Sequence, residues 1–339
     1  MDFNTEVLDN SFQSIQKAAD WLKNGEVVGI PTETVYGLAA NAFDENAVAK
    51  IFKAKGRPSD NPLIVHISAM DMLEELVKEV PILAVKCAEK FWPGPLTMIM
   101  SKTNRIPMIT SGGLDTVGIR MPSHKTAKAI IDACGFPLAA PSANLSGSPS
   151  PTAAQHVFND MCGRIPCIVD GGFSAVGVES TVISFENNGI RLLRPGFISV
   201  DDLKEITENV LIDDGVLHMI DSNAVAASPG MKYKHYSPKA DIIIIDSDTE
   251  NYRKFVSQHS DDKTWCITFG DEDVADVDLP HLSYGKTDAE QAHQLFDVLR
   301  KLDELGAEKA YARCPSKTGV GLAVYNRLLR AAAFQVIKI

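Results

Sequence analysis

Apolar residues at helical spacing predict two helices near the N-terminus. In segment 12–22 they recur every three or four residues, and Asn24-Gly25 ends that helix. A second helix is predicted to begin after Asp44, a suitable N-cap, and to end at Gly56 in the C′ position. Lys55 shares the apolar face of this second helix, so the pattern places it at the edge of the core.

Short apolar runs between these helices and residue 193 predict a mixed α/β domain. The predicted strands cover residues 27–30, 63–67, 96–100, 116–120, 137–140, 168–169, 180–185 and 189–193. Their connections are short and do not alternate regularly with helices, so the pattern favours a mixed sheet over a simple series of βαβ units.

After residue 239 the pattern changes to buried strands that alternate with helices. Strands are predicted at 240–246, 264–270 and 309–313, and helices at 289–305 and 319–334. This alternation is typical of a small doubly wound α/β domain. The last helix opens with GVGLAV, which lacks the full GxGxxG spacing of a dinucleotide loop.

The chain is predicted to have three parts: a first domain over residues 1–205, a linker over 206–239 and a second domain over 240–339. Residues 232–236 of the linker hold two tyrosines, a histidine and two lysines. A passive linker rarely has this composition. We therefore expect the linker to contact a ligand or to fold over the active site.

Charge and cysteine content narrow the functional class. The net charge is −11, so the whole chain does not attract polyanions, and an anionic ligand must meet a local cationic cluster. The six cysteines are scattered and form no CxxC pair, which predicts reduced thiols in a cytoplasmic protein. The N-terminus lacks the pattern of a secretory signal, and no apolar run is long enough to predict a membrane span.

Lys55 and Arg57 flank a glycine at the predicted end of the second helix. They could be solvated charges that favour the helix dipole, or they could hold an anionic ligand. A loop at residues 139–152 favours the ligand, because its serines, its Asn144 and its glycine-permitted backbone N–H groups suit a phosphate or a carboxylate.

Arginines and hydroxyl groups also lie at the ends of predicted strands. Arg120 ends an apolar strand, and a buried arginine requires either a ligand anion or a structural ion pair. Ser180 starts another strand, and Arg194 follows a third. Together these groups suit a phosphate-bearing ligand and a second small polar one. The sequence has no Walker A, HExxH, EF-hand or Ser-His-Asp signature.

Six motifs carry a resemblance to a known family. In chain order they are PTETVYGLAANAF, KGRPSDNPLIVHI, WPGPLT, VGIRMP, APSANLSG and ESTVI. They resemble the YrdC-like domain of L-threonylcarbamoyladenylate synthases, whose Lys-x-Arg and Ser-x-Asn signature is matched by Lys55, Arg57, Ser142 and Asn144. SPGMKYKHYSP and GLAVYNRLLRAAAF resemble the longer, two-domain branch of that family.

The resemblance implies a fold and a reaction. The fold is an N-terminal YrdC-like twisted mixed α/β domain, a linker and a smaller C-terminal Rossmann-like α/β domain. The reaction forms threonylcarbamoyl-AMP and pyrophosphate from L-threonine, bicarbonate or CO₂, and ATP, with Mg²⁺ bound through the ATP phosphates. Downstream tRNA threonylcarbamoyl-transferase proteins use the product to modify the adenosine beside the anticodon. The concave basic face of the family implies weak RNA binding.

The resemblance also implies roles for individual residues. Lys55 and Arg57 would be catalytic and face the triphosphate. The nucleotide would be lined by Arg57, Asn61, Thr116, Ser142, Asn144, Ser150, Arg194 and a linker tyrosine, Tyr233 or Tyr236, between which the sequence does not decide. Threonine would be lined by Thr34, His66, Arg120, Ala140 and Ser180. Arg120 is the natural partner of the threonine carboxylate, since its planar fork matches a carboxylate bidentately. His66 could instead be an ordinary strand histidine.

Two other functions fit parts of the pattern. A YrdC-like module that only binds double-stranded RNA would need dispersed lysines and arginines, but neither the Ser142 and Asn144 loop nor a tyrosine-dense linker. A carbamoyl-transfer enzyme of the hydrogenase-maturation type would carry zinc-finger segments with CxxC pairs, which this chain lacks.

Overall fold

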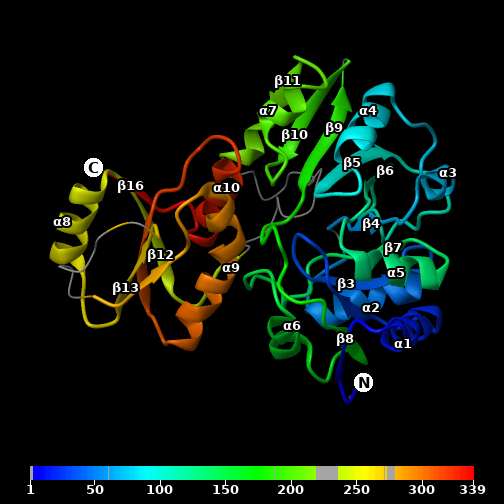
Figure 1. Ribbon diagram of the computed structural model, residues 1–339, viewed down its shortest axis with the longest axis horizontal. Coiled ribbons are helices and arrows are strands. Elements are labelled where there is room, and N and C mark those ends of the chain that lie inside the picture. The colour runs from blue at the N-terminus through cyan, green and yellow to red at the C-terminus, as the bar shows by residue number, and fades with distance from the viewer. Residues whose placement is uncertain (1–2, 60, 187, 219–235, 271, 273–278) are drawn as a thin grey trace. The chain divides into compact units, whose positions relative to one another are not determined.

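The chain forms two compact units (Figure 1). The computed structural model describes residues 3–59, 61–186, 188–218, 236–270, 272 and 279–339. The first unit consists of Met1–Ser146 and Ser150–Lys232, and the second of Gly147–Pro149 and Tyr233–Ile339. All six cysteines are free thiols, and four of them are buried.

In the described part of the first unit, eleven strands form one mixed sheet. They are β1 (Glu6–Leu8), β2 (Val28–Ile30), β3 (Gly37–Asn41), β4 (Ile64–His66), β5 (Leu96–Ser101), β6 (Thr116–Arg120), β7 (Leu138–Ala139), β8 (Cys167–Val169), β9 (Thr181–Glu186), β10 (Gly189–Arg194) and β11 (Val210–Ile212). Their order is β1-β8-β2-β3-β7-β4-β6-β5-β9-β10-β11. Antiparallel pairs such as β5 and β6 lie next to parallel pairs such as β4 and β6. The predicted mixed sheet is therefore confirmed.

Helices of the first unit cover this sheet (Figure 1). They are α1 (Phe12–Lys23), α2 (Glu45–Lys55), α3 (Leu73–Leu76), α4 (Ile82–Phe91), α5 (Lys125–Cys134), α6 (Ala154–Met161) and α7 (Val200–Lys204), with 3₁₀ turns η1 (Met70–Met72) and η2 (Asp214–Val216). The predicted caps of α2 are confirmed. Asp44 accepts hydrogen bonds from the N–H groups of Asn46 and Ala47, and Gly56 has a φ of +67°, which glycine adopts without strain.

Three strands of this sheet were not predicted. β1 and β11 have three residues each and include exposed positions, so they carry no clear alternation. β3 has the sequence GLAAN, whose small residues have little strand propensity, but it lies buried between β2 and β7. Because β11 pairs with β10, the sheet of the first unit continues past the boundary predicted at residue 205.

In its described residues, the second unit contains five strands, and every pairing among them is parallel. The strands are β12 (Asp241–Asp246), β13 (Thr264–Thr268), β14 (His281–Ser283), β15 (Lys309–Arg313) and β16 (Val336–Lys338), and the helices are α8 (Thr249–His259), α9 (Asp288–Glu304) and α10 (Gly321–Ala331). The strand order is β14-β13-β15-β12-β16. This is the predicted Rossmann-like α/β architecture; the short edge strands β14 and β16 were not predicted.

Candidate active site

Lys55, the last residue of α2, is buried. Only 2% of its surface is exposed, because the apolar face of α2 carries it into the core. Its Nζ donates hydrogen bonds to the backbone oxygens of Ser142 and Asn144, at 2.5 and 2.8 Å. The backbone oxygen of Lys55 accepts a hydrogen bond from the N–H of Ser146 at 3.1 Å. Lys55 therefore joins the Lys-x-Arg segment to the Ser-x-Asn loop.

The surroundings of Lys55 lower its pKa well below the ordinary lysine value. Burial is the main cause, and the positive charge of Arg57 adds to it, whereas Asp160 and Glu179 act in the opposite direction. Arg57 itself is only partly buried, and its guanidinium lies 5.2 Å from the centroid of the Phe52 ring. The two cations predicted as a pair thus occupy different environments.

Hydrogen bonds within the first unit also order the polar loop that follows β7. Ser142 Oγ donates to Asn144 Oδ1 at 2.6 Å, and Asn144 Nδ2 donates to the backbone oxygen of Leu145 at 2.8 Å. Ser150, which is fully buried, donates to Glu179 Oε1 at 2.5 Å. These contacts hold the hydroxyl and amide groups in place, which is the preorganisation that a binding loop requires.

Arg120, at the end of β6, has three partners in the protein. Its Nη1 donates to Thr34 Oγ1 at 2.7 Å, its Nε donates to the backbone oxygen of Gly94 at 3.4 Å, and its Nη2 lies 2.8 Å from Glu33 Oε1. The side chains of Arg120 and Glu33 are only 4% and 9% exposed. The sequence left open whether Arg120 meets a ligand anion or forms a structural ion pair; the structure shows the ion pair with Glu33.

The loop formed by residues 31–36 connects the Arg120 contacts with the Lys55 contacts. Thr34 and Glu33 lie in this loop and contact Arg120. At the end of the loop, the backbone oxygen of Tyr36 accepts from the N–H of Ala143 at 2.9 Å, next to Ser142. The predicted cationic segment, the Ser-x-Asn loop and the arginine therefore belong to one connected region of the first unit.

His66 lies beside Arg120 in the sheet, and Ala140 lies on the other side of β4. His66 is opposite Arg120 in the β4–β6 pairing, and the N–H of Ala140 donates to the backbone oxygen of Ile64 at 2.9 Å. Burial, followed by the charge of Arg120, lowers the pKa of His66 to about 3, although Glu33 acts in the opposite direction. His66 is therefore a neutral imidazole at physiological pH.

Ser180 and Arg194 contact each other where β9 begins and β10 ends. Arg194 Nε donates to the backbone oxygen of Ser180 at 3.1 Å, and Arg194 Nη2 donates to Ser180 Oγ at 3.2 Å. Ser180 Oγ also lies 2.8 Å from Thr97 Oγ1. Gly196 permits this close approach, since a Cβ at that position would lie 2.2 Å from Thr181 N.

Asn61 and Thr116 make fewer contacts with the other predicted site residues. Asn61 is 2% exposed, and neither its Oδ1 nor its Nδ2 has a hydrogen-bond partner among the described residues. A buried amide without partners points to a ligand or a water molecule that completes its hydrogen bonds. Thr116 is the partly buried first residue of β6, opposite Ser101 of β5.

Of the two linker tyrosines, the structure describes only Tyr236. Tyr233 lies outside the described residues, as do residues 219–235 of the segment 206–239 that was expected to fold over the site. Tyr236 is 6% exposed in the second unit. Its ring centroid lies 5.2 Å from that of Phe296 and 5.9 Å from the guanidinium of Arg327. The Tyr236 ring is therefore packed within the second unit.

Three polar residues in these contacts were not singled out from the sequence: Glu33, Thr97 and Glu179. Glu33 and Glu179 are both 7% exposed, and buried carboxylates require a cation or hydrogen-bond donors. Glu33 occurs within PTETVYGL, directly after an apolar strand. A carboxylate directly after an apolar strand could have indicated a buried, paired glutamate. The sequence did not show that its partner is Arg120.

The ion pair of Glu33 predicts a pH-dependent stability. Burial is the largest single influence on the pKa of Glu33 and opposes its ionisation. The charge of Arg120, together with hydrogen bonding from Arg120 and from nearby backbone N–H groups, outweighs burial, so the pKa lies below the ordinary glutamate value. A lowered folded-state pKa stabilises the fold above the unfolded-state pKa, and this contribution is lost as pH falls through the folded-state pKa. We expect the difference in unfolding free energy between wild type and Glu33→Gln to be constant from about pH 7 to 5.5 and to shrink below about pH 4.5. Denaturant unfolding across this range measures it, and an equal difference at both ends would contradict the ion-pair origin.

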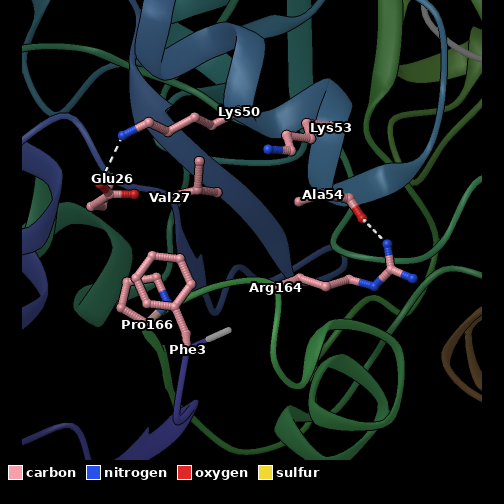
Figure 2. A pocket seen from close by; sticks show the side chains of 8 residues that line it. All are labelled: Phe3, Glu26, Val27, Lys50, Lys53, Ala54, Arg164 and Pro166. Carbon is pink, nitrogen blue, oxygen red and sulfur yellow. Dashed lines mark hydrogen bonds and ion pairs between the residues drawn. The ribbon is translucent and has the colours of Figure 1, made fainter. Parts of the chain in front are cut away.

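A separate pocket of about 180 Å³ lies beside α2 in the first unit (Figure 2). Its lining residues are Phe3, Glu26, Val27, Lys50, Lys53, Ala54, Arg164 and Pro166. Lys50 Nζ pairs with Glu26 at 2.7 Å, and Arg164 Nη1 donates to the backbone oxygen of Ala54 at 3.0 Å. None of the site residues predicted from the sequence lines this pocket.

The described residues lack both a metal-binding cluster and a membrane-spanning helix. They contain no group of three or more His, Cys, Asp or Glu side chains placed to hold a metal ion. They also contain no helix that is both long enough and apolar enough to cross a membrane.

Comparisons with known proteins match both units. A family model described as "Telomere recombination" matches residues 20–196, and one described as "Threonylcarbamoyl-AMP synthase, C-terminal domain" matches residues 198–333. A threonylcarbamoyl-AMP synthase of Pyrococcus abyssi is 43% identical over 331 residues, which cover 96% of each chain. One of Bacillus subtilis is 42% identical and covers 98% of this chain and 97% of its own.

A solved structure agrees with these sequence matches. The structure of P. abyssi Sua5 complexed with L-threonine has a TM-score of 0.91 and 41% identity, and covers 99% of this chain and 100% of its own. Both halves of the chain, the order of its motifs and its fold thus agree with one group of enzymes. The chain belongs to the threonylcarbamoyl-AMP synthase family in its two-domain form.

Proposed function

We propose that this protein forms threonylcarbamoyl-AMP and pyrophosphate from L-threonine, bicarbonate or CO₂, and ATP. The observation that carries the proposal is the connection between two polar groups of the first unit. One group joins Lys55 to the Ser142 and Asn144 loop, and the other surrounds Arg120. A synthase must hold a nucleotide phosphate beside an amino acid, and two connected anion-binding groups suit that need. The relative whose structure contains L-threonine supports the same substrate.

The amino-acid part of the reaction needs a partner for the α-carboxylate. A guanidinium has five N–H donors. In Arg120, Nε donates to Gly94 and Nη1 donates one N–H to Thr34, whereas Nη2 lies in ion-pair contact with Glu33 and makes no hydrogen bond among the described residues. Both Nη atoms therefore retain N–H donors for a ligand. We infer that Arg120 binds the carboxylate and that Thr34, His66, Ala140 and Ser180 line the rest of threonine. Neutral His66 can accept or donate a hydrogen bond without adding charge.

The nucleotide part of the reaction needs position and charge neutralisation. The threonine amine is first carboxylated; an oxygen of the resulting carbamate then attacks the α-phosphorus of ATP, and pyrophosphate leaves. We infer that Arg57 and Lys55 act on the phosphates, Lys55 chiefly by holding the loop in place. The other proposed nucleotide contacts are Asn61, Thr116, Ser142, Asn144, Ser150, Arg194 and Tyr233. We favour Tyr233 over Tyr236 because the Tyr236 ring packs on Phe296.

The remaining parts of the proposal concern the wider reaction. Mg²⁺ would be held by phosphate oxygens of ATP, where it would neutralise charge on the leaving pyrophosphate. Because β11 lies within the predicted linker 206–239 and belongs to the sheet, only the part after η2, residues 217–239, would close over the nucleotide and exclude water from the product. The product would then serve N6-threonylcarbamoyladenosine formation in tRNA, through separate transferase proteins in the cytoplasm. Weak RNA binding by the first unit remains part of this proposal.

The proposed reaction predicts that pyrophosphate release from ATP requires both co-substrates. We expect release with threonine and bicarbonate together, and little release when either is omitted, because no acceptor for the adenylyl group then forms. Ion chromatography measures the pyrophosphate, and mass spectrometry identifies threonylcarbamoyl-AMP. Equal ATP turnover with neither co-substrate would contradict the synthase function and favour an unrelated nucleotidase.

A further inference from the structure

Glu33 is a buried carboxylate to which the proposed reaction gives no role. It is 7% exposed, and its Oε1 lies 2.8 Å from Arg120 Nη2. Neither carboxylate oxygen has a hydrogen bond of good geometry from the described residues. Glu33 can therefore still accept hydrogen bonds, and it lies within the group of residues proposed to hold threonine.

The backbone around Glu33 keeps this carboxylate beside the guanidinium. The N–H of Val176 donates to the backbone oxygen of Glu33 at 2.7 Å, and the neighbouring Thr32 Oγ1 donates to the backbone oxygen of Val35 at 2.6 Å. Thr34, the next residue, is bonded to the same guanidinium through its Oγ1. These hydrogen bonds fix the loop that carries Glu33, and therefore the position of Glu33 beside Arg120.

The charges around Arg120 sum to about zero. Glu33 is ionised at neutral pH because Arg120 lowers its pKa in spite of burial. His66 is neutral because its pKa is about 3, and burial lowers the pKa of His124 as well, against the opposing effect of Glu33. Arg120 and the carboxylate that pairs with it therefore contribute one cation and one anion, both of them buried.

We propose that Glu33 makes the Arg120 subsite selective for a zwitterionic amino acid over simple carboxylate and inorganic anions. This proposal rests on the proposed function, since it takes threonine as the ligand. A zwitterion adds no net charge to a buried neutral site, whereas a simple anion adds an uncompensated charge, which is costly to desolvate. The selectivity would come from repulsion between the Glu33 carboxylate and a simple anion. It would keep bicarbonate and pyrophosphate, a substrate and a product of the proposed reaction, away from Arg120.

The test compares two ligands on the full-length protein by titration calorimetry. One is L-threonine, and the other is 3-hydroxybutyrate, which is threonine without its amino group. We expect wild type to bind threonine more tightly by about a hundredfold or more, because a buried group that should meet the amine is left without a partner. Glu33→Gln keeps the size of the side chain and removes its charge. We expect it to reduce the preference by about tenfold or more, partly through tighter binding of 3-hydroxybutyrate.

Two further variants separate charge from structure. Glu33→Asp keeps the negative charge and should keep more of the preference than Glu33→Gln. Glu26→Gln removes a carboxylate that pairs with Lys50 beside the other pocket, and it should change neither affinity.

Each outcome decides the proposal. Wild type that binds threonine but also binds 3-hydroxybutyrate equally well would overturn it without any variant. A Glu33→Gln protein that retains the full wild-type preference would overturn it as well. Wild type that binds neither ligand would overturn the proposed function together with this inference. A wild type that prefers threonine, together with a Glu33→Gln variant that loses this preference, would support both the proposed function and the role of Glu33.

Discussion

Replacement of Lys55 by alanine is expected to reduce threonine-dependent pyrophosphate release by about 10²–10³-fold, which is typical for loss of a preorganised electrostatic contact. A solvated lysine at a helix end would leave the melting temperature unchanged. Lys55 is instead buried, and its removal leaves the oxygens of Ser142 and Asn144 without their donor. Each unsatisfied buried group costs about 1–3 kcal/mol. We therefore expect a lower melting temperature as well, measured by calorimetry.

Lys53→Ala is the matched control for this experiment. Lys53 lies two residues earlier on α2, is exposed and lines the pocket of Figure 2. We expect the Lys53→Ala protein to keep the activity and the melting temperature of the wild type. If Lys55→Ala lost activity but kept its melting temperature, the role of Lys55 as the anchor of the loop would be wrong. If it kept activity, its role in the reaction would be wrong.

Arg120→Met is expected to destabilise the protein by about 3–5 kcal/mol, the usual cost when one partner of a buried ion pair is removed. Glu33 would then remain as a buried carboxylate without its cation. The double variant Arg120→Met/Glu33→Gln removes both charges, so it should recover most of this stability. Denaturant unfolding of wild type, both single variants and the double variant measures the coupling.

Activity should separate from stability in the same set of variants. Both proteins that carry Arg120→Met should lose threonine-dependent pyrophosphate release, because the proposed partner of the α-carboxylate is gone. The double variant would then be stable and inactive. Wild-type KM for threonine in Arg120→Met would contradict the carboxylate role. A double variant as unstable as Arg120→Met would show that the ion pair is not the source of the loss.

Much of the first unit followed from local patterns. Asp44 and Gly56 mark the two ends of α2 as predicted, since a side-chain cap and a left-handed glycine act within one turn of the helix. The apolar strands β4 and β6 were also predicted, because nearly continuous burial gives a continuous apolar run in the sequence. β3 was missed, because its small residues are buried by neighbouring strands and have little propensity of their own.

Part of the candidate site could also be predicted. Lys55, Ser142 and Arg120 were singled out for chemistry, and the structure connects them within one unit. Glu33 was not singled out, although it lies in a quoted motif. Its importance depends on a contact with Arg120, and no local pattern in the sequence names that partner.

The sequence by itself determined most of the described strands, the helices α1, α2, α9 and α10, the two-part α/β organisation and, through six motifs in order, the family. These properties depend on local periodicity, caps and residue identity. Only the tertiary structure decided that Lys55 is buried against a carbonyl 87 residues away. It also decided that Arg120 pairs with Glu33. Burial and charge pairing arise where distant segments meet, and the free energy of a charged group depends on those neighbours rather than on its place in the chain.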